Sequence, residues 1–265
     1  MRPEVSIKTG YEIQHMRESG RLLADVFAQL DQWMVVGANT LEINQRVEQY
    51  ICHELSARPA SLGAYGYPFA INVSPNNVAC HGMPDEERNI LSSDIVNIDI
   101  TLEKNGFIVD SNKTYVFPDA AEDARRLTDI AYQAMWEGIK QVRPGNQLGN
   151  IGHAIQTFVE ANNCSVVREF CGHGIGRVLH EAPQILHYGL PHTGMVLQEG
   201  MTFTIEPVVN LGTNRVVTLK DGWTVVTCDD SLSAQFEHTI LVTASGAEVL
   251  TLRKEEPQDW RTFIY

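Results

Sequence analysis

Hydrophobic residues recur at helical spacing in four stretches of the chain. The first stretch follows Thr9 and Glu12, which have the spacing of a capping box. Its apolar positions are Ile13, Met16, Leu23, Val26, Phe27 and Leu30. A second stretch begins at Thr40, and helical periodicity returns over residues 122–142 and 148–161, interrupted by the Pro-Gly at 144–145. The pattern predicts four helices arranged as two pairs.

After each helix pair the pattern changes to short strands and turns. The strand-like runs are FAINVS, NNVACHGMP and DIVNIDIT in the first half, and FTIEPVVN, GWTVVTC, FEHTILV and EVLTL in the second. Helices followed by strands, twice over, favour an α+β fold over a doubly wound sheet. Gly37 and Gly145 mark the joint within each helix pair and indicate an internal duplication. We therefore expect one domain over residues 1–265, with halves of roughly 1–120 and 121–265.

Two aspartates lie on the strands of a predicted β-hairpin. Alternation in DIVNIDIT separates Asp99 from the neighbouring isoleucines, and the turn signal EKNG leads into FIVDSNK with Asp110. A turn centred between Lys104 and Asn105 places the two aspartates directly opposite each other. A two-residue Asn105-Gly106 turn places them diagonally. Either register leaves both carboxylates on one face of the hairpin.

These two carboxylates need a compensating charge. Like charges at facing positions repel, and an unpaired carboxylate among apolar residues costs free energy. No Lys or Arg lies on that face within the hairpin. Any one of three arrangements would offset the repulsion between the carboxylates: a protonated aspartate, a basic residue from elsewhere in the chain, or a bound cation. The repulsion would also be small if both aspartates lay at an exposed end of the sheet. Two matched acids inside apolar strands favour metal binding.

Further candidate ligands follow downstream. His173 stands between two glycines in CGHGIG, Glu206 ends the run MTFTIE, and Glu237 lies inside FEHTILV. Acidic residues are disfavoured in strands, and such local conflicts concentrate at functional sites. His180 lies seven residues after His173, whereas His153 and His187 are interpreted as structural histidines.

Four carboxylates and one imidazole form an oxygen-rich donor set. Such a set suits Mn²⁺, Fe²⁺, Co²⁺ or catalytic Zn²⁺ better than a thiolate-bound structural zinc. Two ions about 3.5–4 Å apart activate a bridging water and polarise a carbonyl together. The residues alone predict a metal-assisted hydrolase and do not choose between amides and phosphate esters.

Composition narrows the partners and the compartment. The formal charge of −13 argues against nucleic acid and anionic membranes, which carry the same sign. The five cysteines include no C-x-x-C pair, which argues against a disulfide framework and indicates a reducing compartment. The N-terminal segment MRPEVSIKTG lacks an apolar signal core, and no apolar run reaches the length of a membrane span. We expect a cytoplasmic protein.

Together the motifs resemble the type I methionine aminopeptidases over nearly the whole chain. They are GYP, CHGMP, DIVNIDIT, FIVDSNK, CGHGIG, HEAP, GMTFTIEP, DGWTV and SLSAQFEHTI. The resemblance implies the pita-bread (creatinase/aminopeptidase) fold, with two pseudo-symmetric α+β halves around a curved antiparallel sheet. It also implies a hydrolase, specifically a metalloprotease of the aminopeptidase type, that removes N-terminal methionine with a metal-activated water. The alternative is a related pita-bread aminopeptidase with altered first-residue specificity.

The resemblance also implies roles for individual residues. It implies two divalent ions (Co, Mn, Fe or Zn) held by Asp99, Asp110, His173, Glu206 and Glu237. Asp110 and Glu237 would bridge the ions. Glu206 would shuttle protons, His180 would contact the substrate carbonyl and His81 the peptide nitrogen on the leaving side. The walls of the methionine pocket would be Tyr67 and Trp223.

Several positions around that pocket depart from the family pattern. Ala64 stands where a tyrosine is common, Asn72 where a cysteine is common and Leu179 where a phenylalanine is common. Ser61 replaces a frequent cysteine, and Ser111-Asn112 replaces a usual Thr-Ser pair. None of these removes a ligand, so the departures concern selectivity and efficiency. A small residue at position 64 would widen the pocket.

Expected partners follow from the same resemblance. They are the N-termini of peptides and nascent proteins, with association with ribosomes and a monomeric state as further expectations. Proline-directed relatives carry an extra N-terminal domain, for which the early first helix leaves no room. Non-catalytic relatives would lose ligands and carry basic patches, and a type II enzyme would carry a large insertion in the second half. We therefore expect a catalytic type I enzyme and none of these relatives.

Overall fold

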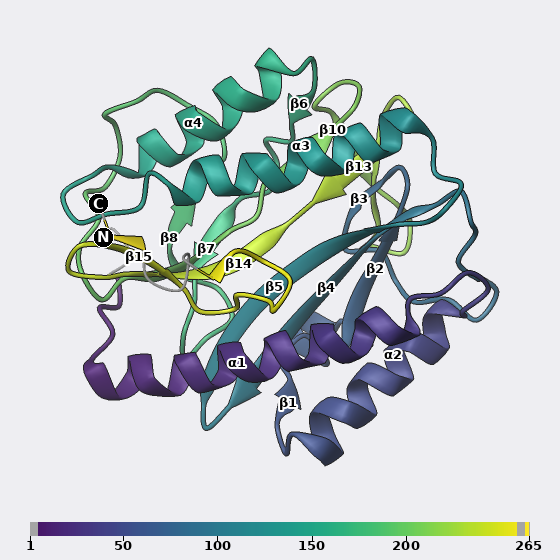
Figure 1. Cartoon of the computed structure of the whole chain (residues 1–265), viewed down its shortest axis with the longest axis horizontal. Helices are drawn as coiled ribbons and strands as arrows, with labels where there is room; N and C mark the ends of the chain where they lie inside the picture. The colour runs from purple at the N-terminus through teal and green to yellow at the C-terminus, as the bar shows by residue number, and fades with distance from the viewer. Residues whose placement is uncertain (1–4, 259–262, 265) are drawn as a thin grey trace.

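In the computed structural model of this chain, a curved antiparallel sheet is accompanied by two pairs of helices, one pair below it and the other above it in the view of Figure 1. The structure describes residues 5–258, 263 and 264. The helices are α1 (Gly10–Trp33), α2 (Thr40–Gln49), α3 (Glu122–Ile139) and α4 (Leu148–Ala161). Short π-helical and 3₁₀ turns lie at Tyr50–Glu54 and Ala64–Gly66. The prediction of two helix pairs in an α+β fold is confirmed.

The largest sheet has the strand order β1-β4-β5-β14-β9-β7-β8, with β2 beside β4, β15 beside β14 and β16 beside β15. Its strands are β1 (Arg58–Pro59), β2 (Ile71–Pro75), β4 (Ile95–Lys104), β5 (Phe107–Val116), β7 (Gly172–Gly174), β8 (Glu181–Ile185), β9 (Thr202–Ile205), β14 (Glu237–Val242), β15 (Gly246–Val249) and β16 (Phe263–Ile264). Two three-stranded sheets have the orders β13-β10-β6 and β11-β12-β3. Their strands are β3 (Val78–Cys80), β6 (Ser165–Val166), β10 (Val208–Asn210), β11 (Val216–Thr218), β12 (Val225–Thr227) and β13 (Ser233–Gln235).

Polar side chains fix where the first two helices begin. Thr9 and Glu12 form the predicted capping box at the start of α1. Asn39 caps α2, where its side chain accepts hydrogen bonds from the backbone N–H groups of Leu41 and Glu42. These local contacts satisfy N–H groups that have no partner within a helix, which is why the sequence locates both starts correctly.

The joints within the two helix pairs have matching geometry. The backbone N–H of Gly37 donates to the carbonyl of Ile90, and that of Gly145 donates to the carbonyl of Leu197. The two glycines have φ values of 87° and 84°. This correspondence agrees with pseudo-symmetric halves, while the boundary near residue 120 stays a prediction. Residues 1–4, 259–262 and 265 of the predicted domain lie outside the described residues, and so does the beginning of the N-terminal segment.

The hairpin of β4 and β5 settles the register of the two aspartates. Asp110 lies opposite Thr101, and Asp99 lies opposite Asn112. The directly opposed register is therefore wrong, and the diagonal one is confirmed. The reason is the turn, in which Asn105 and Gly106 both have positive φ, as a two-residue type I′ turn requires. Asn and Gly adopt that conformation at the least cost.

Two hydrophobic clusters hold the helix pairs against the sheet. Ile98 and Ile100 of β4 join the cluster beneath α1 and α2, whereas Phe203 and Ile205 of β9 join the cluster beneath α3 and α4. Each of these side chains is fully buried and contributes roughly 1.5–3 kcal/mol. Because strand side chains alternate, burying the isoleucines turns Asp99 to the opposite face.

Among the described residues, every helix is too short or too polar to cross a lipid bilayer.

Candidate active site

Five adjacent strands of the large sheet carry the five predicted metal ligands. Asp99 lies on β4, Asp110 on β5, Glu237 on β14, Glu206 directly after β9 and His173 on β7, and these strands are consecutive in the sheet. All five residues line one pocket. Residues far apart in the sequence thus converge because their strands are hydrogen-bonded neighbours. Their assignment as ligands stays a prediction.

Three of the five are close enough to share one ion. Asp110, His173 and Glu237 offer ligand atoms that all lie within 4.8 Å of one another. His173 Nε2 also lies 3.8 Å from Asp110 Oδ2 and 3.6 Å from Glu206 Oε1. The arrangement turns a ring nitrogen and carboxylate oxygens toward a common centre.

Burial makes this cluster electrostatically costly without a cation. Burial raises the pKa of Asp99 to about 6 and the pKa of Glu206 to about 8. The pKa values of Asp110 and Glu237 are also raised, first by burial and then by the charges of the neighbouring carboxylates. A divalent ion between the carboxylates would favour their charged forms and reverse these shifts.

Unpartnered oxygen atoms mark where a cation fits. Within the described residues, Asp99 Oδ1, Asp110 Oδ1 and Glu237 Oε1 are buried and have no hydrogen-bond partner. Buried polar atoms are almost always hydrogen-bonded, because leaving one unsatisfied costs free energy. Three such atoms at one place fit a site for divalent metal ions.

His173 has the protonation state that a metal ligand needs. Burial lowers the pKa of His173 to about 3, so the imidazole is neutral. Its Nδ1 donates to the backbone carbonyl of Gly174 over 3.0 Å, which leaves the lone pair on Nε2. Nε2 is the ring nitrogen that lies within 4 Å of the Asp110 and Glu206 carboxylates, so its lone pair is available at the proposed metal site.

Hydrogen bonds around Glu206 hold it in place. The Thr204 hydroxyl donates to Glu206 Oε1 over 2.6 Å, and the Gln235 amide donates to the Glu206 backbone carbonyl over 3.0 Å. His187, interpreted from the sequence as structural, accepts the backbone N–H of Glu206 through Nε2. His153 is exposed on α4. Sequence reasoning missed Gln235, although it lies two residues before Glu237.

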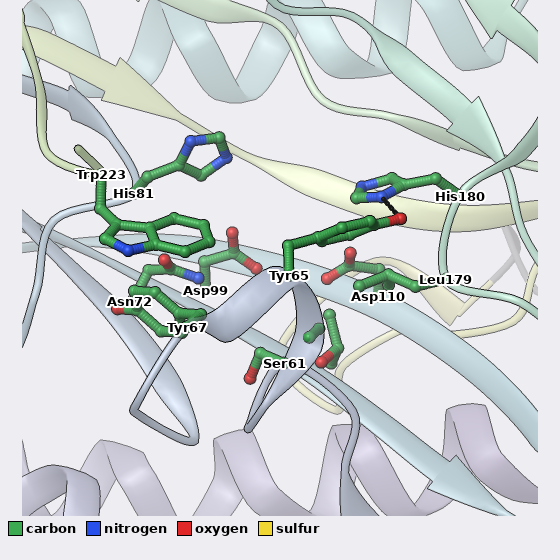
Figure 2. A pocket seen from close by; sticks show the side chains of 12 residues that line it. Ser61, Tyr65, Tyr67, Asn72, His81, Asp99, Asp110, Leu179, His180 and Trp223 are labelled. Carbon is green, nitrogen blue, oxygen red and sulfur yellow. Dashed lines mark hydrogen bonds between the residues drawn. The ribbon is translucent and has the colours of Figure 1, made fainter. Parts of the chain in front are cut away.

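A second pocket, lined by aromatic and imidazole side chains, adjoins the carboxylates (Figure 2). It is lined by Ser61, Ala64, Tyr65, Tyr67, Asn72, His81, Asp99, Thr101, Asp110, Leu179, His180 and Trp223. The rings of Tyr67 and Trp223 meet edge to face with centroids 5.0 Å apart. The Tyr67 hydroxyl donates to the backbone carbonyls of Ile71 and Gly82, which anchors the ring. The predicted pocket residues therefore lie together beside the carboxylates.

The two predicted catalytic histidines lie on either side of this pocket (Figure 2). Burial lowers the pKa of His81 to about 4 and also lowers the pKa of His180, so both rings are neutral near pH 7. The His180 ring packs edge to face on His173 with centroids 4.3 Å apart. Tyr65, which sequence reasoning did not single out, stacks on His180.

This fold and site define a metal-dependent hydrolase, with buried carboxylates and one neutral imidazole beside an aromatic pocket. A model of metallopeptidase family M24 matches residues 14–244, and the chain belongs to that family.

Known relatives are consistent with the motifs. A methionine aminopeptidase from Salmonella typhimurium is 48% identical over 252 residues, which cover 95% of this chain and 96% of the relative. The crystal structure of methionine aminopeptidase from Rickettsia prowazekii has a TM-score of 0.92 at 44% identity, covering 94% of this chain and 100% of that one. The crystal structure of methionine aminopeptidase from Thermotoga maritima has a TM-score of 0.91 at 40% identity, covering 94% of this chain and 99% of that one. The resemblance to methionine aminopeptidases and the pita-bread fold are confirmed.

Proposed function

We propose that this chain is a metalloaminopeptidase that removes the N-terminal methionine from peptides and nascent proteins. The observation that carries the proposal is the convergence of Asp99, Asp110 and Glu237, each with an unpartnered buried oxygen, beside an aromatic pocket. Membership of family M24 and the 48% identity to a methionine aminopeptidase support methionine as the residue removed.

Two divalent ions are part of the proposal. One ion would be held by Asp110, His173, Glu206 and Glu237, and the other by Asp99 together with Asp110 and Glu237. The oxygen-rich donor set supports Mn²⁺, Fe²⁺, Co²⁺ or Zn²⁺. When bound, the ions supply a nucleophilic water near neutral pH and polarise the scissile carbonyl.

Protein side chains would transfer the proton and stabilise the charge that develops on the carbonyl oxygen. In the hydrolysis, water adds to the carbonyl carbon, the carbon–nitrogen bond breaks and the leaving nitrogen gains a proton. Glu206 is the proposed proton shuttle, because its carboxyl group lines the same pocket as the other proposed ligands and can take a proton from the water and pass it to the leaving nitrogen. His180 would donate to the carbonyl oxygen as it becomes negative, and His81 would contact the leaving nitrogen.

The pocket supports selection of the first residue. Tyr67 and Trp223 would form apolar walls for the methionine side chain, with Leu179 also lining the pocket. Asp99 lines both this pocket and the carboxylate site, so the substrate's free amine would lie beside its carboxylate. That placement explains why only a chain end would be cut.

Peptide hydrolysis by the metal-depleted and reloaded protein tests the function. The protein is stripped with a chelator, dialysed, and given one divalent ion at a time with Met-Ala-Ser, Ala-Ala-Ser and Xaa-Pro peptides. We expect cleavage of Met-Ala-Ser only after an ion is restored. Full turnover by the stripped protein, or preferred cleavage of an Xaa-Pro peptide, would overturn the proposal.

A matched pair of histidine variants tests the ligand assignment. His173→Ala should lower kcat/KM by more than about 100-fold, because changes to groups that only support ligands already cost 10–100-fold. His153→Ala, at an exposed position on α4, is the control and should behave as the wild type. Bound metal per chain, measured by elemental analysis, should fall only for His173→Ala.

The proposal also includes the oligomeric state of the protein, its compartment and its association with ribosomes. We infer a monomer in the cytoplasm that acts on nascent chains as they leave the ribosome. The site needs no second subunit, because all the proposed ligands come from one chain. Light scattering measures the mass in solution, and co-sedimentation with ribosomes measures that association. A stable dimer or the absence of ribosome binding would correct this part alone.

A further inference from the structure

Tyr65 is an exposed aromatic residue in an unfavourable backbone conformation at the rim of the pocket. It lies within the 3₁₀ turn Ala64–Gly66 and has φ 51° and ψ 17°, in the left-handed region. The residue is 71% exposed. Such conformations are costly for a bulky residue and persist where surrounding contacts hold them, often at functional sites.

Glycines on both sides shape the turn that presents this ring. Gly63 and Gly66 have φ values of 82° and 87°, so the segment bends back with three residues in the left-handed region. The N–H of Gly63 donates to the Tyr67 carbonyl, and the N–H of Tyr67 donates to the Ala64 carbonyl, which closes the turn. Tyr65 is thus carried across the pocket toward His180 by a short, internally bonded loop (Figure 2).

The contact between Tyr65 and His180 is specific. The Tyr65 hydroxyl lies 2.9 Å from His180 Nδ1, and the rings stack with centroids 5.4 Å apart and an interplanar angle of 27°. Figure 2 shows the hydrogen bond across the pocket. A phenolic hydroxyl is a good donor, and a neutral imidazole carries its proton on one nitrogen only. A hydroxyl that donates to Nδ1 leaves the proton on Nε2.

We propose that Tyr65 is a positioning residue that fixes the Nε2–H tautomer of His180 and closes the rim of the first-residue pocket with its ring. The inference rests on the proposed function, in which His180 donates a hydrogen bond to the scissile carbonyl. With Nδ1 engaged by the hydroxyl, Nε2–H is the donor that remains. The ring forms a wall of the pocket next to Ala64, whose methyl group leaves room.

Two variants separate the hydroxyl from the ring. Tyr65→Phe removes the donor and keeps the ring, and it should lower kcat about 3- to 10-fold with little change in KM. Tyr65→Ala removes both, and it should also raise KM for Met-Ala-Ser. Tyr11→Phe is the control, because Tyr11 is equally exposed, at 69%, and lies on α1. It should leave both constants unchanged.

The tautomer itself can be observed directly. In protein labelled with ¹⁵N at histidine and loaded with Zn²⁺, the His180 nitrogens should give a protonated-type Nε2 signal and an unprotonated-type Nδ1 signal. Tyr65→Phe should shift both toward an average of the two tautomers, an effect that a loss of stability alone would not produce.

The possible outcomes are distinct. Wild-type kinetics and a wild-type ¹⁵N pattern in Tyr65→Phe would overturn the inference while leaving the proposed function intact. Failure of the wild-type protein to cleave any methionyl peptide would instead refute the proposed function. In that case the ¹⁵N pattern still decides whether Tyr65 sets the tautomer.

Discussion

The side-chain amide of Asn112 donates a 2.9 Å hydrogen bond to Oε2 of Glu237. The two residues are paired across β5 and β14, and the other Glu237 oxygen, Oε1, has no partner within the described residues. The Asn97 side-chain amide donates in turn to the side-chain oxygen Oδ1 of Asn112 over 3.0 Å. One oxygen of Glu237 is therefore held by the protein, while the other is left for a cation.

Removing that support should weaken metal binding. Asn112→Ala is expected to reduce the affinity of the metal-free protein for Mn²⁺ by about 10–100-fold, because groups that orient ligands have effects of this size. Titration calorimetry measures the affinity, and Asn112→Ser tests whether a smaller polar group suffices. Unchanged Mn²⁺ affinity in Asn112→Ala would show that Glu237 needs no orienting partner.

The stability of the metal-free protein should fall as the pH rises from 7 to 8.5. The pKa of Glu206 is about 8 in the folded state, above its ordinary value of 4.5, so the folded state holds more protons across this window. Stability is then lost with rising pH, by up to about 1.4 kcal/mol per pH unit for one group. Below pH 6.5 the neutral buried histidines oppose this slope, since His81, with a pKa of about 4 in the folded state, takes up a proton on unfolding between pH 6.5 and 4.

Thermal unfolding with and without metal checks this behaviour. The Tm of the stripped protein should decrease between pH 7 and 8.5, and Mn²⁺ should raise Tm most at the higher pH, because it binds the ionised carboxylates. Glu206→Gln, which cannot ionise, should flatten the slope. A stripped protein that becomes more stable over this range would contradict the raised pKa.

A larger residue at position 64 should sharpen first-residue selectivity. Ala64 and Leu179 line the pocket beside Tyr67. Ala64→Tyr is expected to raise the ratio of kcat/KM for methionine over phenylalanine peptides by about 10-fold, within the range that pocket size provides. A peptide panel differing only in the first residue measures the ratio, with Val36→Ala, at an exposed site on the α1–α2 loop, as control. An unchanged ratio would mean that Ala64 does not limit the pocket.

A buried charged network behind the site should be important for stability. Arg253 donates to Glu256 over 2.7 Å, and Glu256 also lies 3.1 Å from His238 Nε2. Arg253 and Glu256 are 1% and 5% exposed. Glu256→Ala removes the buried partner of Arg253 and leaves only the more distant, exposed Glu255, 3.7 Å from Arg253 Nε, so it should reduce the free energy of unfolding by about 3–5 kcal/mol.

Urea denaturation measures this loss. Glu199→Ala is the control, because it also removes a glutamate carboxylate but at an exposed position away from Arg253, where a charge contributes little to stability. A Glu256→Ala protein as stable as the control would show that solvent or a rearranged side chain satisfies Arg253.

The sequence predicted helix starts and the hairpin turn correctly, because contacts between residues close together in the chain decide both. The capping contacts at both helix starts are short-range. Thr9 and Glu12 each accept from the other's backbone N–H within one turn, and Asn39 accepts from N–H groups two and three residues ahead. The sequence therefore shows where both helices begin. The Asn105-Gly106 pair was the correct clue to the hairpin register, because both residues must have positive φ. The competing register failed for the same local reason.

Residues that act across the sheet were harder to find. Alternation places Asn112 on the face of Asp110, which is the signal that could have identified it, but its bond to Glu237 spans 125 positions in the sequence. Tyr65 offered only two flanking glycines as a hint of an unusual turn. Its role depends on His180, which is 115 positions away.

The sequence by itself determined the helix ends, the strand alternation and the types of residue available as ligands, because capping, turn geometry and side-chain period are set by near neighbours. Only the tertiary structure decided that β4, β5, β14, β9 and β7 lie side by side and bring Asp99, Asp110, Glu237, Glu206 and His173 to one pocket. Strand order depends on burial and hydrogen bonding between distant segments, and no local pattern encodes it.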